Sequence, residues 1–284
     1  MKTNRFLAGI MIVTGIAAIT FASCKREEED SDTNSAGDNA FAESAFNDVT
    51  NISDEAGYTG NVSNYRLANS EGIIASSCAT VTFDSTNTSD QDTIHINFGS
   101  SNCYCTADGR NRRGEILVYY SGHYRDSAST HTITFNNYFV NDNQILGTKT
   151  VVNNGHNAAG HLVYTITVTG GEVILANNGG TVYWNSTRQR EWTQGESTLI
   201  WSDDVYSITG TASGQGTDGH HFDINITSPL IRNMTLGCRR HFVQGTLDLT
   251  PDNKPVRHVD FGSGACDDIA TVTINSHTYT IHMR

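Results

Sequence analysis

Proline and positive charge are both scarce in this chain of 284 residues. Only Pro229, Pro251 and Pro255 occur, against 26 glycines, and 18 basic residues face 30 acidic ones, which gives a formal net charge of −12. Binding to phosphate backbones needs a basic footprint, so this balance argues against a nucleic-acid partner.

Several sequence motifs of known chemistry are also missing. There is no G-x-S-x-G elbow, no H-E-x-x-H pair and no glycine-rich phosphate loop. Cys103-Tyr104-Cys105 and the adjacent His220 and His221 do not supply three or four ligands at a metal spacing. The sequence therefore predicts no metal site and no cofactor, and it favours a protein that is not an enzyme.

The first residues of the chain have the pattern of an export signal. Lys2 and Arg5 form a basic start, residues 6–21 are almost wholly apolar, and the small residues Ala22 and Ser23 follow. The apolar stretch is shorter than the ~20 residues that span a bilayer as a helix. We therefore interpret residues 1–23 as a removable leader, whose loss would change the net charge from −12 to −14.

Phe21-Ala22-Ser23-Cys24 resembles a bacterial lipobox, with Phe21 in place of the usual leucine. The resemblance implies that Cys24 becomes the lipidated N-terminus of the mature protein. The acidic run in residues 25–30 resembles the export tag of surface lipoproteins of the Bacteroidota. Together these segments imply an outer-membrane lipoprotein that faces the cell exterior and contacts the membrane through its lipid, because two or more acyl chains anchor a protein stably.

The next part of the chain changes from polar to helical. Residues 24–40 are rich in Glu, Asp, Ser and Asn, which predicts a flexible tether. Phe41, Ala45, Val49 and Ile52 then recur at helical spacing, and Asp38 or Asn39 is available as N-cap. We expect one short helix and a lead-in within residues 41–72, docked on the following body.

Residues 73–284 alternate between apolar and polar side chains with a period of two. Examples are T-I-H-I-N-F at 93–98, Y-T-I-T-V at 164–168 and T-V-T-I-N at 271–275, and glycine- and asparagine-rich turns separate the segments. Short turns join antiparallel neighbours. The pattern predicts an all-β body in which an antiparallel meander forms a curled sheet, an open barrel or a sandwich.

Five cysteines follow Cys24, and an exported protein meets oxidising conditions that favour disulfides. Two segments share a pattern: each second cysteine lies five residues after the phenylalanine of a Phe-Gly-Ser turn, at 98–103 and at 261–266. We therefore predict the disulfides Cys78–Cys103 and Cys238–Cys266 in a unit repeated near each end of the body. Pairing through Cys105 in place of Cys103 remains the alternative.

All three tryptophans fall in one window of eighteen residues. Trp184, Trp192 and Trp201, with Tyr183 beside them, are candidates for binding a sugar by stacking, although the same residues can fill a core between strands. Glu191, Glu196 and Asp203 lie nearby and are the candidate carboxylates of a hydrolase.

Three functions remain open at this point. The first is a non-enzymatic binding or structural module of the cell envelope, whose partner is a glycan or another envelope protein. The second is a glycan-binding lipoprotein that uses the Trp184 to Trp201 region, and the third is a carboxylate-dependent hydrolase.

Overall fold

The computed structural model describes residues 30–59, 78–84, 92–122, 124–198 and 200–283. Contacts divide the chain into the units Met1–Asp30 and Ser31–Arg284. The predicted leader and the predicted lipidation site, Cys24, lie outside the described residues, whereas all described helices and strands belong to the second unit.

In the described part of the second unit, one α-helix precedes a long series of strands. The elements are α1 (Asn34–Thr59), β1 (Thr80–Asp84), β2 (Asp92–Asn97), β3 (Cys103–Cys105), β4 (Arg110–Tyr120), β5 (Thr130–Val140), β6 (Asn143–His156), β7 (Leu162–Ile174), η1 (Ala176–Asn178), β8 (Thr181–Gln194), η2 (Trp201–Asp203), β9 (Val205–Gln215), β10 (His221–Asn233), β11 (Gln244–Pro251), β12 (Arg257–Ser263), β13 (Ile269–Ile274) and β14 (His277–His282).

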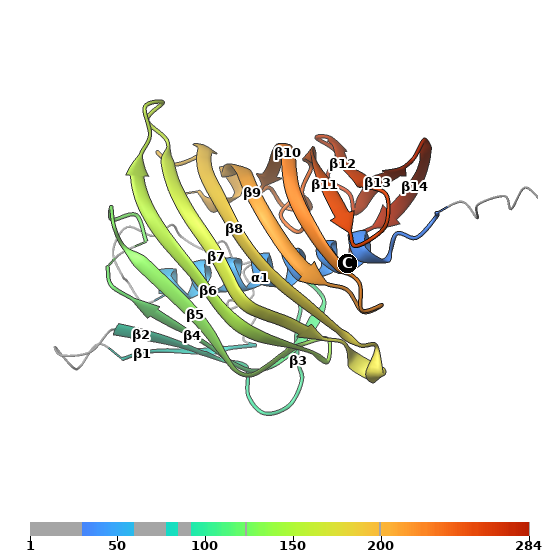
Figure 1. Cartoon of the computed structure of the whole chain (residues 1–284). Helices are drawn as coiled ribbons and strands as arrows, with labels where there is room; N and C mark the ends of the chain where they lie inside the picture. Colours follow the sequence, from blue (N-terminus) through green and yellow to red (C-terminus); the bar gives the residue numbers. More distant parts are fainter. Residues whose placement is uncertain (1–29, 60–77, 85–91, 123, 199, 284) are drawn as a thin grey trace, which may run out of the picture. The chain divides into compact units, whose positions relative to one another are not determined.

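The strands form one antiparallel sheet in which neighbours in space follow the order of the chain. Only β3 departs from this path, because it pairs with β4 alone. Figure 1 shows the resulting progression of colour across the sheet. The all-β meander predicted from the sequence is confirmed. Among the three predicted shapes, the sheet is curled and is not closed into a barrel.

Glycines within strands allow neighbouring backbones to approach where the sheet bends. Gly210 in β9 has φ 123°, and a Cβ there would lie 2.2 Å from the carbonyl oxygen of Thr187. Gly147 in β6 has φ 111° and sits at a shift in the β6–β7 register. Such irregularities bend a strand and increase its twist, which helps the meander curl on itself.

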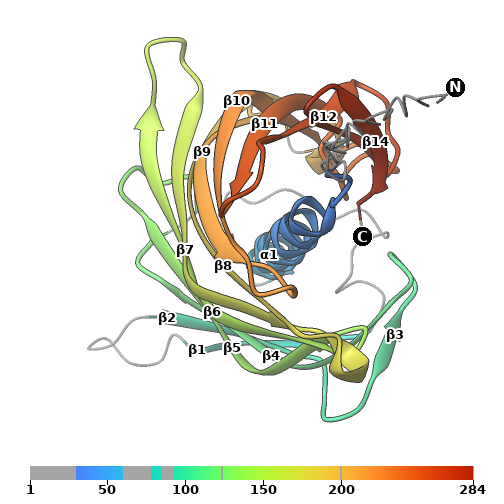
Figure 2. The same ribbon diagram turned by 45° about the vertical axis from the view of Figure 1, so that its right-hand side comes forward.

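The helix α1 lies inside the curl of the sheet, as Figure 2 shows. It has 26 residues and begins at Asn34, so two predictions need correction: the helix is not short, and residues 34–40 are helical, not a tether. Asp38 and Asn39 are interior residues of the helix and not its N-cap. Their contacts with the sheet, described below, stabilise helical turns that have no apolar period of their own.

Two clusters of buried apolar residues lie within the unit. The larger one packs Ala42, Phe46 and Val49 of α1 against inward-facing residues of the sheet, with Phe46 stacked on Trp184 at a ring distance of 5.6 Å. The smaller one surrounds Tyr164 and Trp192.

Both predicted disulfides are present. The Cα atoms of Cys78 and Cys103 are 5.7 Å apart, and those of Cys238 and Cys266 are 4.4 Å apart. Cys105 is buried outside both bridges, which rules out the alternative pairing in this structure.

The two Phe-Gly-Ser turns have the same local geometry. The side chain of Asn97 accepts a hydrogen bond from the Gly99 amide at 2.7 Å, and Asp260 accepts one from Gly262 at 2.8 Å. The glycines have φ values of 82° and 84°. The first turn follows β2 and the second forms the end of β12. Each of these strands pairs with the strand before it, β1 or β11, and with a further antiparallel strand, β4 or β13.

Candidate functional site

Positive charges are buried on the inward face of the sheet, beneath α1. Each of these six basic residues is at most 4% exposed. Burying a charge without a partner costs much free energy. The six residues come from every second strand: Arg112 of β4, Lys149 of β6, Arg188 and Arg190 of β8, Arg232 of β10 and Arg257 of β12.

Acidic side chains of α1 neutralise several of these cations. Glu43 accepts hydrogen bonds from two nitrogens of Arg188 at 3.1 and 3.2 Å, a bidentate pair that is almost fully buried. Asp48 accepts one from Arg112 at 2.7 Å and lies 3.5 Å from Arg110. Burial alone would raise the pKa of Asp48, but Arg112 and Arg110 hold it below its usual value.

Farther along α1 lies the half-buried carboxyl group of Asp54, and near it the buried amine of Lys149 in β6; neither is in a close ion pair within the described part of the chain. Burial raises the pKa of Asp54 to about 6, although Arg190, Lys149 and Arg232 oppose this shift. Burial and the charge of Arg232 lower the pKa of Lys149 to about 7. The Lys149 amine donates a 2.8 Å hydrogen bond to the carbonyl oxygen of Phe46, so it also holds the helix backbone.

Further contacts fix the first half of α1. The Trp184 indole donates to Asn39 at 2.9 Å, and the amide and hydroxyl of Thr217 donate to Asp38 at 2.7 and 2.9 Å. The concave face of the sheet is therefore filled by the protein's own helix.

The sequence held a signal for the buried cations. Within a strand, residues of the same parity share a face, and Arg188 and Arg190 have the parity of the buried Val182 and Trp184. Basic residues on a strand usually face the solvent, so the expectation from residue type opposes the expectation from parity.

One side of α1 is left uncovered by the sheet and forms the floor of a groove, which we call the seam groove. Its volume is about 910 Å³, which is in the upper part of the usual range for ligand sites. The helix contributes Gly37, Asp38, Phe41 and Ala45, and the walls come from β14 and from the region of β4 to β8. The wall residues include Arg110, Val140, Asn141, Asn143, Ile145, Leu175, Asn177, Thr217, Ile281 and His282.

The lining of the seam groove mixes apolar and hydrogen-bonding groups. Phe41, Ala45, Leu175 and Ile281 are only partly buried and pack against the main core from its surface. Amides, hydroxyls and a few charges stand among them. Eleven of its twenty lining residues are polar or charged, so the groove offers more hydrogen-bonding groups than the usual small-molecule site, which is mostly apolar.

Two loops meet over the C-terminal half of α1. Arg239 donates to the carbonyl oxygen of Ala107 at 3.4 Å, and Arg240 donates to that of Asp108. We call these contacts the clasp. The loop with Arg239 follows the disulfide-bonded Cys238, and the loop with Ala107 follows β3, which contains Cys103. Each disulfide thus holds one side of the clasp.

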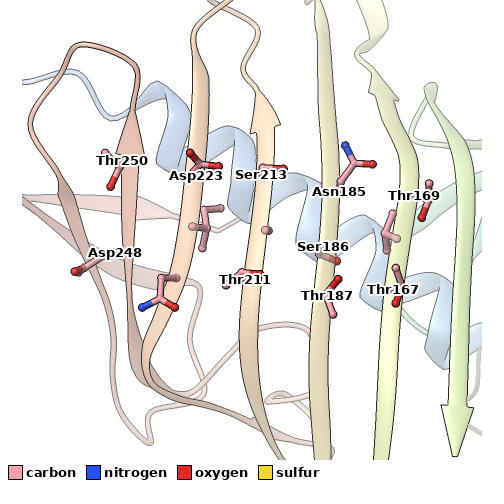
Figure 3. A pocket seen from close by; sticks show the side chains of 14 residues that line it. Thr167, Thr169, Asn185, Ser186, Thr187, Thr211, Ser213, Asp223, Asp248 and Thr250 are labelled. Carbon is pink, nitrogen blue, oxygen red and sulfur yellow. The ribbon is translucent and has the colours of Figure 1, made fainter.

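A second hollow lies on the outer face of the sheet, opposite α1, and has a volume of about 690 Å³ (Figure 3). Its side chains are neighbours across five strands. One row, paired strand to strand, is Thr167, Thr187, Thr211, Asn225 and Asp248. The exposed side chains of this hollow are polar, and no aromatic ring lines it. It therefore has no counterpart of the partly buried apolar side chains, such as Phe41 and Leu175, that line the seam groove.

The predicted aromatic site is corrected in part. Trp184 and Trp192 are only 2% and 4% exposed, so these two residues belong to the core and cannot stack on a ligand. They are buried because their parity places them on the inward face of β8. Tyr183 has the opposite parity and is 44% exposed, and Trp201 is partly exposed with the Arg239 guanidinium 5.4 Å from its ring centre.

The candidate hydrolase carboxylates pair with neighbouring side chains. Glu191 contacts His161 at 2.6 Å and accepts from Asn157 at 2.9 Å, and these hydrogen bonds lower its pKa. Glu196 contacts His156 at 2.8 Å, and Asp203 accepts from the Thr198 hydroxyl at 2.8 Å. A general acid for glycoside hydrolysis requires a raised pKa, which Glu191 does not have.

Among the described residues, no group of three or more His, Cys, Asp or Glu side chains is arranged to hold a metal ion. In the same part of the chain, no helix is both long and apolar enough to cross a membrane. No protein-family model, curated protein or solved structure matches the chain.

Proposed function

We propose that the protein is a non-enzymatic binding module of the cell envelope and that its ligand occupies the seam groove. In this proposal, a lipid on Cys24 anchors the protein in the outer membrane on the exterior side. The partners are this membrane and a glycan or another envelope protein, and the negative net charge argues against nucleic acid.

The observation that carries the proposal is the seam groove itself. It is the larger of the two wide hollows described above, and it combines partly buried apolar side chains with many hydrogen-bonding groups. The helix that forms the floor of the groove is fixed to the sheet by buried ion pairs, so the site is held in shape before a ligand arrives. A preformed site loses little conformational entropy on binding.

Two features support the envelope location. Disulfides persist in oxidising compartments, and the two bridges stabilise the unit that carries the groove. Neither bridge uses Cys24, which leaves that thiol available for the lipid.

The anchor is tested by Cys24→Ser in the full chain. We expect the variant to leave the membrane fraction and to be recovered soluble and folded, because serine lacks the sulfur atom to which the proposed lipid anchor would be attached. Fractionation followed by circular dichroism checks both points. A variant that stays in the membrane fraction would contradict the proposed anchor.

The groove is tested at Gly37, where a Cβ atom would meet no other atom within 4 Å. Gly37→Trp should project a ring into the groove and abolish binding in a screen of envelope oligosaccharides, with the Cys24→Ser chain as background. Gly37→Ala is the matched control. It should retain binding and stabilise α1 by about 0.5–1 kcal/mol, because glycine is unfavourable inside a helix.

Binding that survives Gly37→Trp unchanged would contradict the seam groove as the site. The glycan alternative is kept because Trp201 is partly exposed beside the C-terminal half of α1. The proposal no longer includes Trp184 and Trp192 as contact residues.

A further inference from the structure

A small pocket lined by arginines adjoins the seam groove toward the C-terminal half of α1. Ser44, Asp48 and Arg110 line both the groove and this pocket, which has a volume of about 30 Å³. We call it the arginine pocket. Its remaining guanidinium groups are those of Arg232 in β10 and of Arg239 and Arg240 in the loop that follows.

The arginines of this pocket differ in their partners. Arg110 lies against Asp48, and Arg112, which is buried just behind, contacts both Asp48 and Asp108. Asp48 and Asp108, two of the three carboxylates that line the pocket, are therefore already neutralised from within the protein.

Arg232 and Arg240 make no ion pair within the described residues. Arg232 donates to the carbonyl oxygen of Arg239 at 3.1 Å, and Arg240 donates to that of Asp108. Both contacts are to neutral main-chain oxygens, which leave the positive charges of these side chains without a carboxylate in contact.

Charge in the pocket is unbalanced as a consequence. Four arginines (110, 232, 239 and 240) line the pocket together with the carboxylates of Asp48, Glu55 and Asp108, which leaves one positive charge in excess. Arg232 is only 4% exposed, and burial together with the charge of Arg190 lowers its pKa to about 10. Buried charges are normally paired, so an anion in this pocket would supply a missing partner.

We infer that the arginine pocket binds the oxyanion of an acidic sugar, either a carboxylate or a sulfate ester, at one end of the ligand in the seam groove. This inference rests on the proposed function and names its ligand class. Arg240, at the exposed mouth, and Arg232, in the interior, donate to the oxyanion, since a guanidinium group matches carboxylate and sulfate oxygens. The partly exposed Trp201 ring and the Asn51 amide, which line the same pocket, contact the sugar.

The experiment is calorimetric titration of the Cys24→Ser chain with glucuronate, glucose 6-sulfate, glucose and inorganic sulfate at constant ionic strength. We expect saturable binding of glucuronate or glucose 6-sulfate, at least about tenfold tighter than that of glucose. Arg240→Gln should weaken this binding by about tenfold or more, because it removes a charge-assisted hydrogen bond.

Arg113→Gln is the matched control. Arg113 lies on the same strand as Arg110 but pairs with Asp142, away from the pocket, so this variant should bind like the parent chain. Arg240→Lys keeps the charge without the planar fork and should give intermediate affinity. A thermal unfolding curve without ligand verifies that each variant is folded.

Three results would overturn the inference. They are equal affinities for glucose and its acidic counterparts, unchanged affinity in Arg240→Gln, and inorganic sulfate binding as tightly as the acidic sugars. The titration uses monosaccharides and a pocket variant, whereas Gly37→Trp tests the wide part of the groove with longer ligands. Failure of the pocket is therefore distinguishable from failure of the groove.

Discussion

At the scale of single residues, buried charge dominates the interface between α1 and the sheet. Glu43 and Arg188 have side chains that are 6% and 4% exposed and form two hydrogen bonds with each other. A buried ion pair contributes little net stability compared with an apolar pair, but removing one partner leaves an uncompensated charge. Such pairs favour one position of α1 on the sheet, because a displaced helix would leave buried charges unpaired.

Glu43→Gln should therefore lower the free energy of unfolding by about 3 kcal/mol, because Arg188 would be left charged and buried. Asp248→Asn is the control, since Asp248 pairs with His258 where both side chains are more than a third exposed. It should cost less than about 1 kcal/mol. Urea unfolding of both variants gives the comparison, and equal effects would contradict the role assigned to Glu43.

Asp54 gives a prediction on pH. Burial raises its pKa to about 6 in the folded protein, above the ordinary value of 3.8. Its contribution to stability is therefore fully present below about pH 4 and is lost as the pH rises through about 6.

Asp54→Asn removes this dependence. Relative to the parent chain, the variant should gain about 2 kcal/mol of stability between pH 4 and pH 7.5, given 1.36 kcal/mol for each pKa unit. Denaturant unfolding at the two pH values measures the difference. If the variant and the parent differ in free energy of unfolding by the same amount at both pH values, the Asp54 carboxyl has its ordinary pKa and the prediction is wrong.

At the scale of elements, the disulfides stabilise the two ends of the meander and the clasp over α1. Cys238 and Cys266 are 28 residues apart in the sequence, and closing a loop of this length stabilises a fold by about 3 kcal/mol in the chain-entropy model. Cys238 directly precedes Arg239 and Arg240, which donate to the loop on the other side of the helix.

The double variant Cys238→Ser and Cys266→Ser should lose about 3 kcal/mol of stability, and amide exchange should increase at Ala107, Asp108 and the residues that follow Cys238. Mass mapping of unreduced peptides verifies that Cys78–Cys103 is intact. Loss of stability with unchanged exchange at the clasp would mean that the bridge does not hold this loop.

At the scale of the whole molecule, α1 is a core element of a sheet that has only one layer. The inward face of the sheet carries six cations and most of the larger apolar cluster, and α1 covers both. A single curled sheet without this helix would expose its apolar face and would lose the carboxylates of Glu43, Asp48 and Asp54.

Deletion of residues 34–59 should therefore abolish the native fold. We expect loss of the near-ultraviolet circular dichroism of the buried Trp184 and Trp192, and loss of a cooperative unfolding transition. Deletion of the acidic residues 25–29, which precede the described unit, is the control and should leave both signals unchanged. A cooperative transition in the chain without α1 would contradict this role.

The all-β meander and both disulfides followed from the sequence alone. The period of two along residues 73–284 and the short turns determine antiparallel strands in chain order, because each strand must bury one face. The repeated Phe-Gly-Ser turns located the cysteine pairs, since the same local backbone geometry recurs at Asn97 to Gly99 and at Asp260 to Gly262.

Tertiary structure decided the extent of α1, the location of the tryptophans and the candidate site. Asp38 and Asn39 accept hydrogen bonds from Thr217 and Trp184, which lie 179 and 145 residues away in the sequence, and these contacts fix the first turns of α1. The seam groove exists because the sheet stops short of closure, and its lining comes from residues as distant as Asp38 and Ile281. The sequence periodicity specifies which face of each strand is buried, but the contact between distant strands and the helix determines what that face encloses.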